Sequence, residues 1–263
     1  LSFSVFRILL RNGFHEASRF GQNLRLARRS HYPKMHMCGR ASFAFDSGSI
    51  AALRAVFSTG PLQLLQTSTA LPRPAGSSRS NSEKARAARK AAVLVPLCNH
   101  NGIASLLFTV RSSEVSTHKG QVSFPGGHLE PGEDAIGAAL RETREEIGDS
   151  LGEIEVLGTC QTLPAVTGTP VTSVVAFLQK DVGPLLPKLV LSPEVETVFT
   201  LSISELLDPS FRSTDDLGPR GKLPAFTAGP SRVWGLTAVI TDGVLRNGIV
   251  PSLEQAAPAE EGD

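Results

Sequence analysis

Gly127-His-Leu-Glu-Pro-Gly-Glu133 and, seven residues later, Arg141-Glu-Thr-Arg-Glu-Glu-Ile-Gly148 are the most informative stretches of this 263-residue chain. The sequence predicts a helix over roughly residues 134–147, which the glycine at 148 ends. A helix turns about 100° per residue, so Glu142, Glu145 and Glu146 share one face. A different face carries Ile136, Leu140, Thr143 and Ile147. The helix is therefore expected to bury one side and to present three carboxylates on another.

The three carboxylates indicate a metal site. Like charges at positions i and i+4 destabilise a helix by roughly 0.2–0.5 kcal/mol, and bound cations remove that repulsion. Clustered carboxylate oxygens are hard ligands that select Mg²⁺ or Mn²⁺, and magnesium usually bridges protein carboxylates to substrate phosphates. The alternative is a solvated acidic face that pairs with Arg141 and Arg144. The cluster thus predicts bound Mg²⁺ or Mn²⁺ and phosphate chemistry.

The residues around the helix favour the metal site over a solvated face. Phe124-Pro-Gly-Gly127 predicts a tight turn at the end of a strand, where a backbone without side chains can approach a ligand closely. We therefore expect Gly126 and Gly127 to contact the substrate. Glu133 and Arg141 are spaced to form an ion pair that joins the loop to the helix.

The rest of the pattern predicts a mixture of strands and helices. Strands are expected at residues 91–97, 103–110, 121–124, 154–157, 171–178 and 196–201, and further helices at 202–207 and 231–246. Asn99-His-Asn-Gly102 predicts a turn that makes the first two strands a hairpin. Residues 208–223 are turn-rich and are expected to form a surface loop. Because the elements do not alternate as βαβ units, the pattern predicts α+β or an α/β/α sandwich with a mixed sheet, and not a doubly wound sheet.

Composition divides the chain into four segments. Residues 1–34 hold seven basic residues and one acid among apolar residues and serines, which is typical of a mitochondrial transit peptide. A basic tail and a nucleic-acid-binding arm are the alternatives. Residues 35–82 are low in complexity and expected to be largely disordered, although residues 50–57 fit a helix. Residues 83–250 are the expected catalytic domain, which begins with a short helix at 82–90, and residues 251–263 are an acidic, disordered tail.

Composition also weighs against several classes of site. The three cysteines, Cys38, Cys98 and Cys160, are widely spaced and form no Cys-x-x-Cys pair, which argues against a disulfide framework and a structural zinc site. The net charge of +1 gives no support for a nucleic-acid partner. No run approaches the roughly 20 apolar residues of a membrane-spanning helix. The expected partner is a small-molecule substrate.

The spacing of the informative stretches resembles the Nudix box, in which Gly, Glu, Arg-Glu, Glu-Glu and Gly recur at fixed intervals. The matching residues are Gly127, Glu133, Arg141, Glu142, Glu145, Glu146 and Gly148. The resemblance implies a Nudix-type α/β/α sandwich and metal-dependent cleavage of a diphosphate bond. Thr143 and Asp149 occupy positions that are usually aliphatic, and neither is a ligand position.

The resemblance also implies a role for each residue. Glu142 and Glu146 would be the main metal ligands, and Glu145 a further ligand or the base that activates water. The carbonyl of Gly127 would add a ligand, while Glu133 and Arg141 would support the loop. A metal lowers the pKa of an attacking water, and phosphoryl chemistry needs mainly positioning and charge stabilisation. The expected catalytic residues are Glu142, Glu145, Glu146 and Arg141.

The segment before the box resembles the coenzyme A diphosphatase branch of this family. The matching positions are Leu107, Thr109, Arg111, Ser112, Gly120 and residues 124–127. Residues 233–240 resemble the late helix of its mitochondrial animal members. The resemblance implies cleavage of coenzyme A or acyl-CoA to adenosine 3′,5′-bisphosphate and (acyl-)4′-phosphopantetheine in mitochondria. Ser116 replaces an arginine of this signature, so Arg111 and Lys119 are the candidate substrate-binding cations.

Two other functions stay open. One is a Nudix hydrolase of another nucleotide diphosphate, such as NADH, a nucleotide sugar or an oxidised nucleotide, which the serine at 116 allows. The other is a non-catalytic module that binds coenzyme A or nucleotides, although such a module has no need of three mutually repelling carboxylates. Outside the box, we expect Glu194 and Glu196 at a solvated strand entry and Trp234 in the core.

Overall fold

The computed structural model describes residues 43–65, 89–113, 120–218 and 221–256. The strands are β1 (Ala91–His100), β2 (Ile103–Arg111), β3 (Val122–Ser123), β4 (Gly126–His128), β5 (Ile154–Thr159), β6 (Leu163–Pro164), β7 (Pro170–Leu178), β8 (Val195–Ser202), β9 (Arg212–Asp216) and β10 (Lys222–Phe226). The helices are α1 (Ser47–Ser58), α3 (Ala135–Ile147), α4 (Ile203–Leu207), α5 (Gly235–Val244) and α6 (Val250–Ala256), with the 3₁₀ turns η1 (Asp149–Leu151), η2 (Leu186–Lys188) and η3 (Pro209–Phe211) and the π-helix η5 (Leu245–Ile249).

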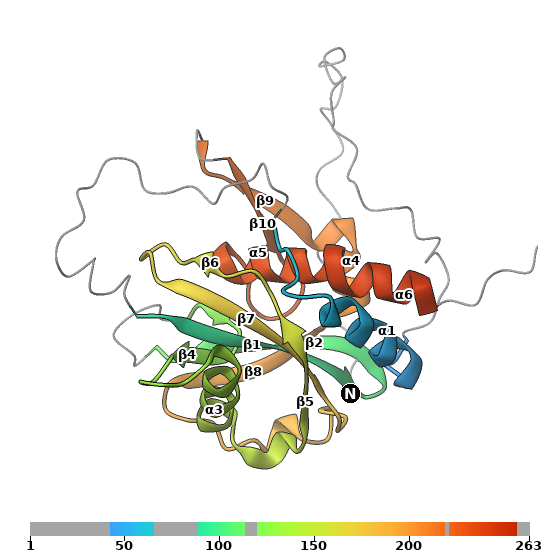
Figure 1. Ribbon diagram of the computed structural model, residues 1–263, viewed down its shortest axis with the longest axis horizontal. Helices are drawn as coiled ribbons and strands as arrows, with labels where there is room; N and C mark the ends of the chain where they lie inside the picture. Colours follow the sequence, from blue (N-terminus) through green and yellow to red (C-terminus); the bar gives the residue numbers. More distant parts are fainter. Residues whose placement is uncertain (1–42, 66–88, 114–119, 219–220, 257–263) are drawn as a thin grey trace, which may run out of the picture. The chain divides into compact units, whose positions relative to one another are not determined.

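Eight strands form one mixed sheet (Figure 1). Its central order is β3-β2-β1-β7-β5. Outside this order, β4 pairs with β1, β6 with β7 and β8 with β2. β1 and β7 run parallel, with Ala91 opposite Val171. β1 and β2 run antiparallel, with Leu97 opposite Leu106. The predicted mixed sheet and the predicted hairpin are therefore confirmed.

Helices cover both faces of this sheet, because its central strands are apolar on both sides. Side chains alternate between faces along a strand. Leu94 of β1 therefore packs with Ala138 of α3, whereas its neighbour Val95 belongs to the cluster that includes Phe57 of α1 and Ile240 of α5. Figure 1 shows α3 on one side of the sheet and α1, α5 and α6 on the other. The predicted α/β/α sandwich is confirmed.

The helix α1 lies within the segment that was expected to be largely disordered, and for residues 43–65 that expectation is wrong. Asp46 caps the helix by accepting a hydrogen bond from the backbone of Ser49 at 2.8 Å. Leu53 and Phe57 are buried in the main core. A domain that began at residue 83 would lack Leu53 and Phe57, which are part of its main core. Most of the expected helix at 82–90 and all of residues 1–34 lie outside the described residues.

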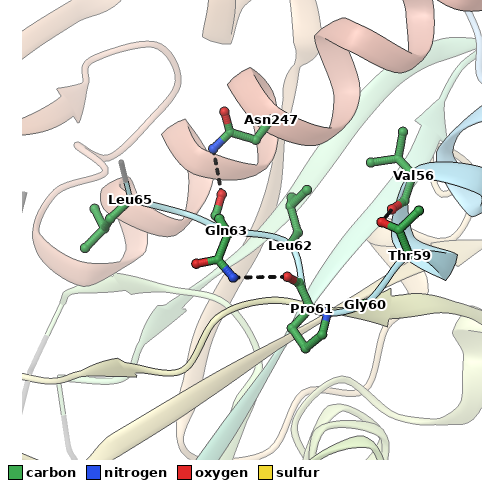
Figure 2. A pocket seen from close by; sticks show the side chains of 8 residues that line it. All are labelled: Val56, Thr59, Gly60, Pro61, Leu62, Gln63, Leu65 and Asn247. Atoms are coloured by element: carbon green, nitrogen blue, oxygen red, sulfur yellow. Dashed lines mark hydrogen bonds between the residues drawn. The ribbon is translucent and has the colours of Figure 1, made fainter. Parts of the chain in front are cut away.

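The segment after α1 is joined to the C-terminal helices. Asn247 of η5 donates a hydrogen bond from its side-chain amide to the carbonyl of Gln63 at 2.6 Å. Gly243 packs against the backbone of Leu64 so closely that a side chain there would clash. An open hollow of about 630 Å³ lies between these segments, and Figure 2 shows the side chains that line it. The N-terminal and C-terminal segments thus stabilise one another.

Two elements near the C-terminus differ from prediction. Residues 208–223 are not a simple surface loop, because β9 and β10 pair as a hairpin. The guanidinium of Arg212 lies 4.7 Å from the ring centre of Phe226 and forms an ion pair with Asp242. These contacts join residues far apart in the sequence, which local patterns do not reveal.

The late helix also begins later than expected. α5 starts at Gly235, which takes a positive φ of 62°, because Val233 instead pairs with Phe226. The preceding Trp234 is 43% exposed, so its expected burial in the core is wrong. Residues 251–256 are helical and Ser252 is fully buried, which contradicts a disordered tail from residue 251. No helix among the described residues has the length and apolar character needed to span a membrane.

Candidate active site

The helix α3 carries the predicted carboxylates and lies against β1, β4 and β7. Its start is capped by Asp134, whose side chain accepts a hydrogen bond from Gly137 at 2.7 Å. Its end is Gly148, at a φ of 87° that favours glycine. The predicted helix is therefore confirmed to within one residue. Thr143, at the usually aliphatic position, is fully buried and donates its hydroxyl to the carbonyl of Ala139 at 2.7 Å, so this departure leaves no unsatisfied polar group.

The three carboxylates are buried to very different degrees. Glu146 is 7% exposed, whereas the side chain of Glu142 is 21% exposed and that of Glu145 is 58% exposed. They share one face of the helix, but of the three only Glu146 is buried. The exposure of the three carboxylates thus increases from Glu146 through Glu142 to Glu145.

The glycines of the β4 turn let the helix come close. Gly126 donates its backbone N–H to a carboxylate oxygen of Glu146 at 3.3 Å. A Cβ on Gly127 would lie 2.5 Å from the carboxylate carbon of Glu142, a distance that real Cβ atoms do not reach. Both predicted substrate-contacting glycines therefore lie directly beside predicted ligands.

Arg141 connects the loop to the carboxylates. Its Nε and Nη2 donate to the two carboxylate oxygens of Glu133, both at 3.0 Å, and Nη2 also donates to the carbonyl of His128 at 3.1 Å. Its Nη1 lies 3.2 Å from Glu142 and 3.1 Å from Glu145. The predicted pairing of Glu133 with Arg141 is confirmed. Arg141 holds the β4–α3 loop and two carboxylates in one network.

Burial changes the acidity of the two inner carboxyls. It raises the pKa of Glu146 to about 7, although the Gly126 N–H and the charge of Arg111 oppose this shift. Burial also raises the pKa of Glu142, an effect that the neighbouring Arg141 opposes. The hydrogen bond from Arg141 lowers the pKa of Glu133. For the inner pair burial outweighs the neighbouring cations, whereas for Glu133 the hydrogen bond from Arg141 outweighs burial.

The carboxylate oxygens of Glu142, Glu145 and Glu146 are ligands of a chemical type that suits a divalent cation. Within the described part of the chain, no three His, Cys, Asp or Glu side chains are already grouped as a metal site. Glu142 and Glu145 instead share Nη1 of Arg141, because like charges separate or pair when no cation lies between them. A buried carboxyl with a pKa near 7 is an environment in which a bound cation removes a desolvation cost. Glu142 and Glu146 are therefore the residues best placed to hold it.

The other predicted site residues divide into those the structure places and those it does not. Arg111 lies at the end of β2 and forms an ion pair with Glu194 at 3.1 Å. The charges of Arg111 and Glu194 both affect the pKa of Glu146, so both border the site. Glu194, expected at a solvated strand entry, is 60% exposed but paired. Lys119 and Ser116 lie outside the described residues.

A second feature beside the box was not found by sequence analysis. A hollow of about 610 Å³ borders Glu142 and Arg141 and is also lined by Arg89, Lys90 and His128. The signal in the sequence was the basic pair directly before the first strand, which we had placed in a helix at 82–90. The pairing of β1 with β4 brings that pair to the site.

Comparison with known proteins assigns the chain to a family. The model of the NUDIX domain matches residues 88–218. The chain is 43% identical over 164 residues to the mitochondrial coenzyme A diphosphatase NUDT8 of Homo sapiens, a match that covers 59% of this chain and 68% of that protein. It is 44% identical to NUDT8 of Mus musculus, covering 59% and 76%. It is 34% identical to Nudix hydrolase 3 of Caenorhabditis elegans, covering 56% and 68%.

Proposed function

Because the chain belongs to the Nudix hydrolase family and is a hydrolase of pyrophosphate bonds, we propose that it cleaves coenzyme A or an acyl-CoA. The products would be adenosine 3′,5′-bisphosphate and (acyl-)4′-phosphopantetheine. The observation that carries the reaction is the position of Glu146, enclosed on α3 against the Gly126 backbone. The substrate is supported by the signature over residues 107–127 and by the names of the human and mouse relatives.

Each residue of the site then has a task. Nudix hydrolases generally need divalent metal ions, and we propose Mg²⁺ or Mn²⁺ held by Glu142 and Glu146 with the Gly127 carbonyl. When bound, such an ion neutralises the diphosphate and makes an attacking water more acidic. Glu145 is the exposed carboxylate and would serve as a further ligand or accept the proton of that water. Arg141 keeps the β4–α3 loop against the helix.

The serine at 116 favours a second candidate, a Nudix hydrolase of another nucleotide diphosphate, because an arginine of the coenzyme A signature is missing there. Arg111 or Lys119 would have to bind the substrate in its place, and Arg111 already pairs with Glu194. We therefore keep NADH, ADP-ribose and oxidised nucleotides in the test of substrate.

The test measures release of adenosine 3′,5′-bisphosphate from coenzyme A by the full chain with Mg²⁺, Mn²⁺ or EDTA. Glu146→Gln should remove turnover, whereas Glu254→Gln, an exposed carboxylate on α6, should not change it. Turnover of NADH or ADP-ribose without turnover of coenzyme A would overturn the substrate. Metal-independent turnover, or an active Glu146→Gln variant, would overturn the mechanism.

We also propose that the protein is mitochondrial. The support is the basic, acid-poor composition of residues 1–34 and the mitochondrial relatives in human and mouse. The full chain fused to a fluorescent protein should co-localise with a mitochondrial marker, and the same fusion without residues 1–34 should not. Equal distribution of both fusions would contradict the proposal.

A further inference from the structure

The hollow beside the box is lined by both acidic and basic side chains. Its lining residues are Arg89, Lys90, His128, Leu129, Glu130, Pro131, Glu133, Arg141 and Glu142. Its volume of about 610 Å³ lies within the range of small-molecule sites, roughly 300–1,000 Å³. Glu142 belongs both to this hollow and to the candidate metal site. A ligand in the hollow would therefore touch the reacting centre.

Strand pairing brings the basic pair, Arg89 and Lys90, close to the β4 turn. Ala92 lies opposite Gly127, the residue beneath the Glu142 carboxylate, and Ala91 lies opposite His128. One residue further along, Leu129 donates its N–H to the carbonyl of Lys90 at 3.0 Å. Along the chain, Lys90 and Arg89 precede Ala92, the partner of Gly127, by two and three residues. The β1–β4 ladder therefore places the backbone of the basic pair near the β4 turn.

The positive charges of Arg89 and Lys90 are not neutralised by any acid of the described residues. Both side chains are exposed, and neither forms an ion pair there. Two acids of the hollow, Glu133 and Glu142, already pair with Arg141. Glu130 is the remaining acid that lines the hollow. An anionic group entering the hollow would find donors of both kinds, the planar fork of arginine and the point charge of lysine.

We propose that Arg89 and Lys90 form a subsite for a phosphate monoester of the substrate that is separate from the diphosphate being cleaved. This inference rests on the proposed function, under which that group is the 3′-phosphate of coenzyme A. With the diphosphate at Glu142 and Glu146, a monoester on the attached ribose would extend into the hollow that Arg89 and Lys90 also line. His128 is a further lining residue. The subsite gives the enzyme a means to distinguish coenzyme A from nucleotides that lack this phosphate.

The test compares coenzyme A with 3′-dephospho-coenzyme A. The full chain should show a kcat/KM about tenfold or more higher for coenzyme A, as expected for charged hydrogen bonds to one phosphate. The double variant Arg89→Ala, Lys90→Ala should lose that preference and keep its kcat/KM for the dephospho substrate. Lys180→Ala, two residues beyond the end of β7 and at a lysine that forms no ion pair with a described residue, should retain the preference. Equal losses on both substrates, or none, would overturn the subsite.

A binding experiment separates this inference from the proposed reaction. With Mg²⁺ present, calorimetry should show that the native chain binds adenosine 3′,5′-bisphosphate more tightly than AMP, and that the double variant binds both alike. If neither coenzyme A substrate is hydrolysed but this difference in affinity holds, the proposed function fails and the subsite stands. If the native chain binds both nucleotides equally, the subsite is wrong whatever the turnover.

Discussion

A Cβ added to Gly127 would lie 2.5 Å from the carboxylate carbon of Glu142, so any side chain at position 127 would displace that carboxylate. The φ of Gly127 does not require glycine, because its backbone takes no left-handed conformation. The glycine instead leaves room for the carboxylate at the end of the flexible Glu142 side chain. The position of the Glu142 carboxylate therefore depends on the glycine fifteen positions earlier in the chain.

Gly127→Ala should remove activity with little loss of stability. The added methyl displaces Glu142, and misplacement of a catalytic group by about 1 Å costs on the order of a hundredfold in rate. We expect kcat/KM to fall by about that factor while the melting temperature changes little. The control is Gly48→Ala in α1, whose added Cβ meets only an ordinary contact at 3.5 Å. Full activity of Gly127→Ala would contradict the close approach.

Glu146 should make the metal-free protein less stable as pH rises. Burial raises the pKa of its carboxyl in the folded protein to about 7, above the reference value of 4.5. Both states are protonated well below pH 4.5, so no effect is expected there. Between about pH 4.5 and 7 the unfolded chain loses this proton first, and the free energy of unfolding falls by up to about 3 kcal/mol. Above pH 7 the loss is constant.

The measurement is urea denaturation in EDTA at pH 5 and pH 8. Glu146→Gln cannot ionise, so its free energy of unfolding should fall less over this interval than that of the native chain. The variant should also be the more stable protein at pH 8. A native chain and a Glu146→Gln variant with the same pH dependence would refute the raised pKa.

Arg141→Lys should impair activity although it keeps the positive charge. A lysine cannot contact both oxygens of Glu133 and the carbonyl of His128 at once, since it lacks the planar fork. We expect kcat/KM to fall by about tenfold or more, with the larger change in kcat. Arg54→Ala, which removes the exposed pair with Glu155, is the matched control and should leave kcat/KM unchanged. A fully active Arg141→Lys would show that charge alone suffices.

Leu53→Ala should destabilise the domain although it lies 89 positions before Glu142. Leu53 is fully buried in the main core, and such truncations cost about 2–5 kcal/mol. Val166→Ala, at a residue 89% exposed, should cost less than about 0.5 kcal/mol. Both values come from chemical denaturation. A negligible cost for Leu53→Ala would mean that α1 does not belong to the folded domain.

Local sequence predicted α3 and the first hairpin because both depend on short-range chemistry. Asp134 and Gly148 cap the helix within its own length, and the turn at Asn101, with a φ of 51°, joins adjacent strands. The hairpin of β9 and β10 escaped prediction because Arg212 pairs with Asp242, thirty residues away. The exposure of Trp234 was not predicted, because no local pattern distinguishes an aromatic residue in the core from one at an exposed helix start.

The sequence by itself determined which side chains share the reactive face, because the pitch of a helix places Glu142, Glu145 and Glu146 together in any surroundings. Only the tertiary structure decided how they differ. Glu146 is enclosed and Glu145 is solvated because one side of α3 rests on the β4 turn while the other meets solvent. It also decided that Arg89 and Lys90 border the site, because β1 and β4 pair only once the sheet has formed. Burial and strand pairing depend on residues distant in sequence, which no local spacing encodes.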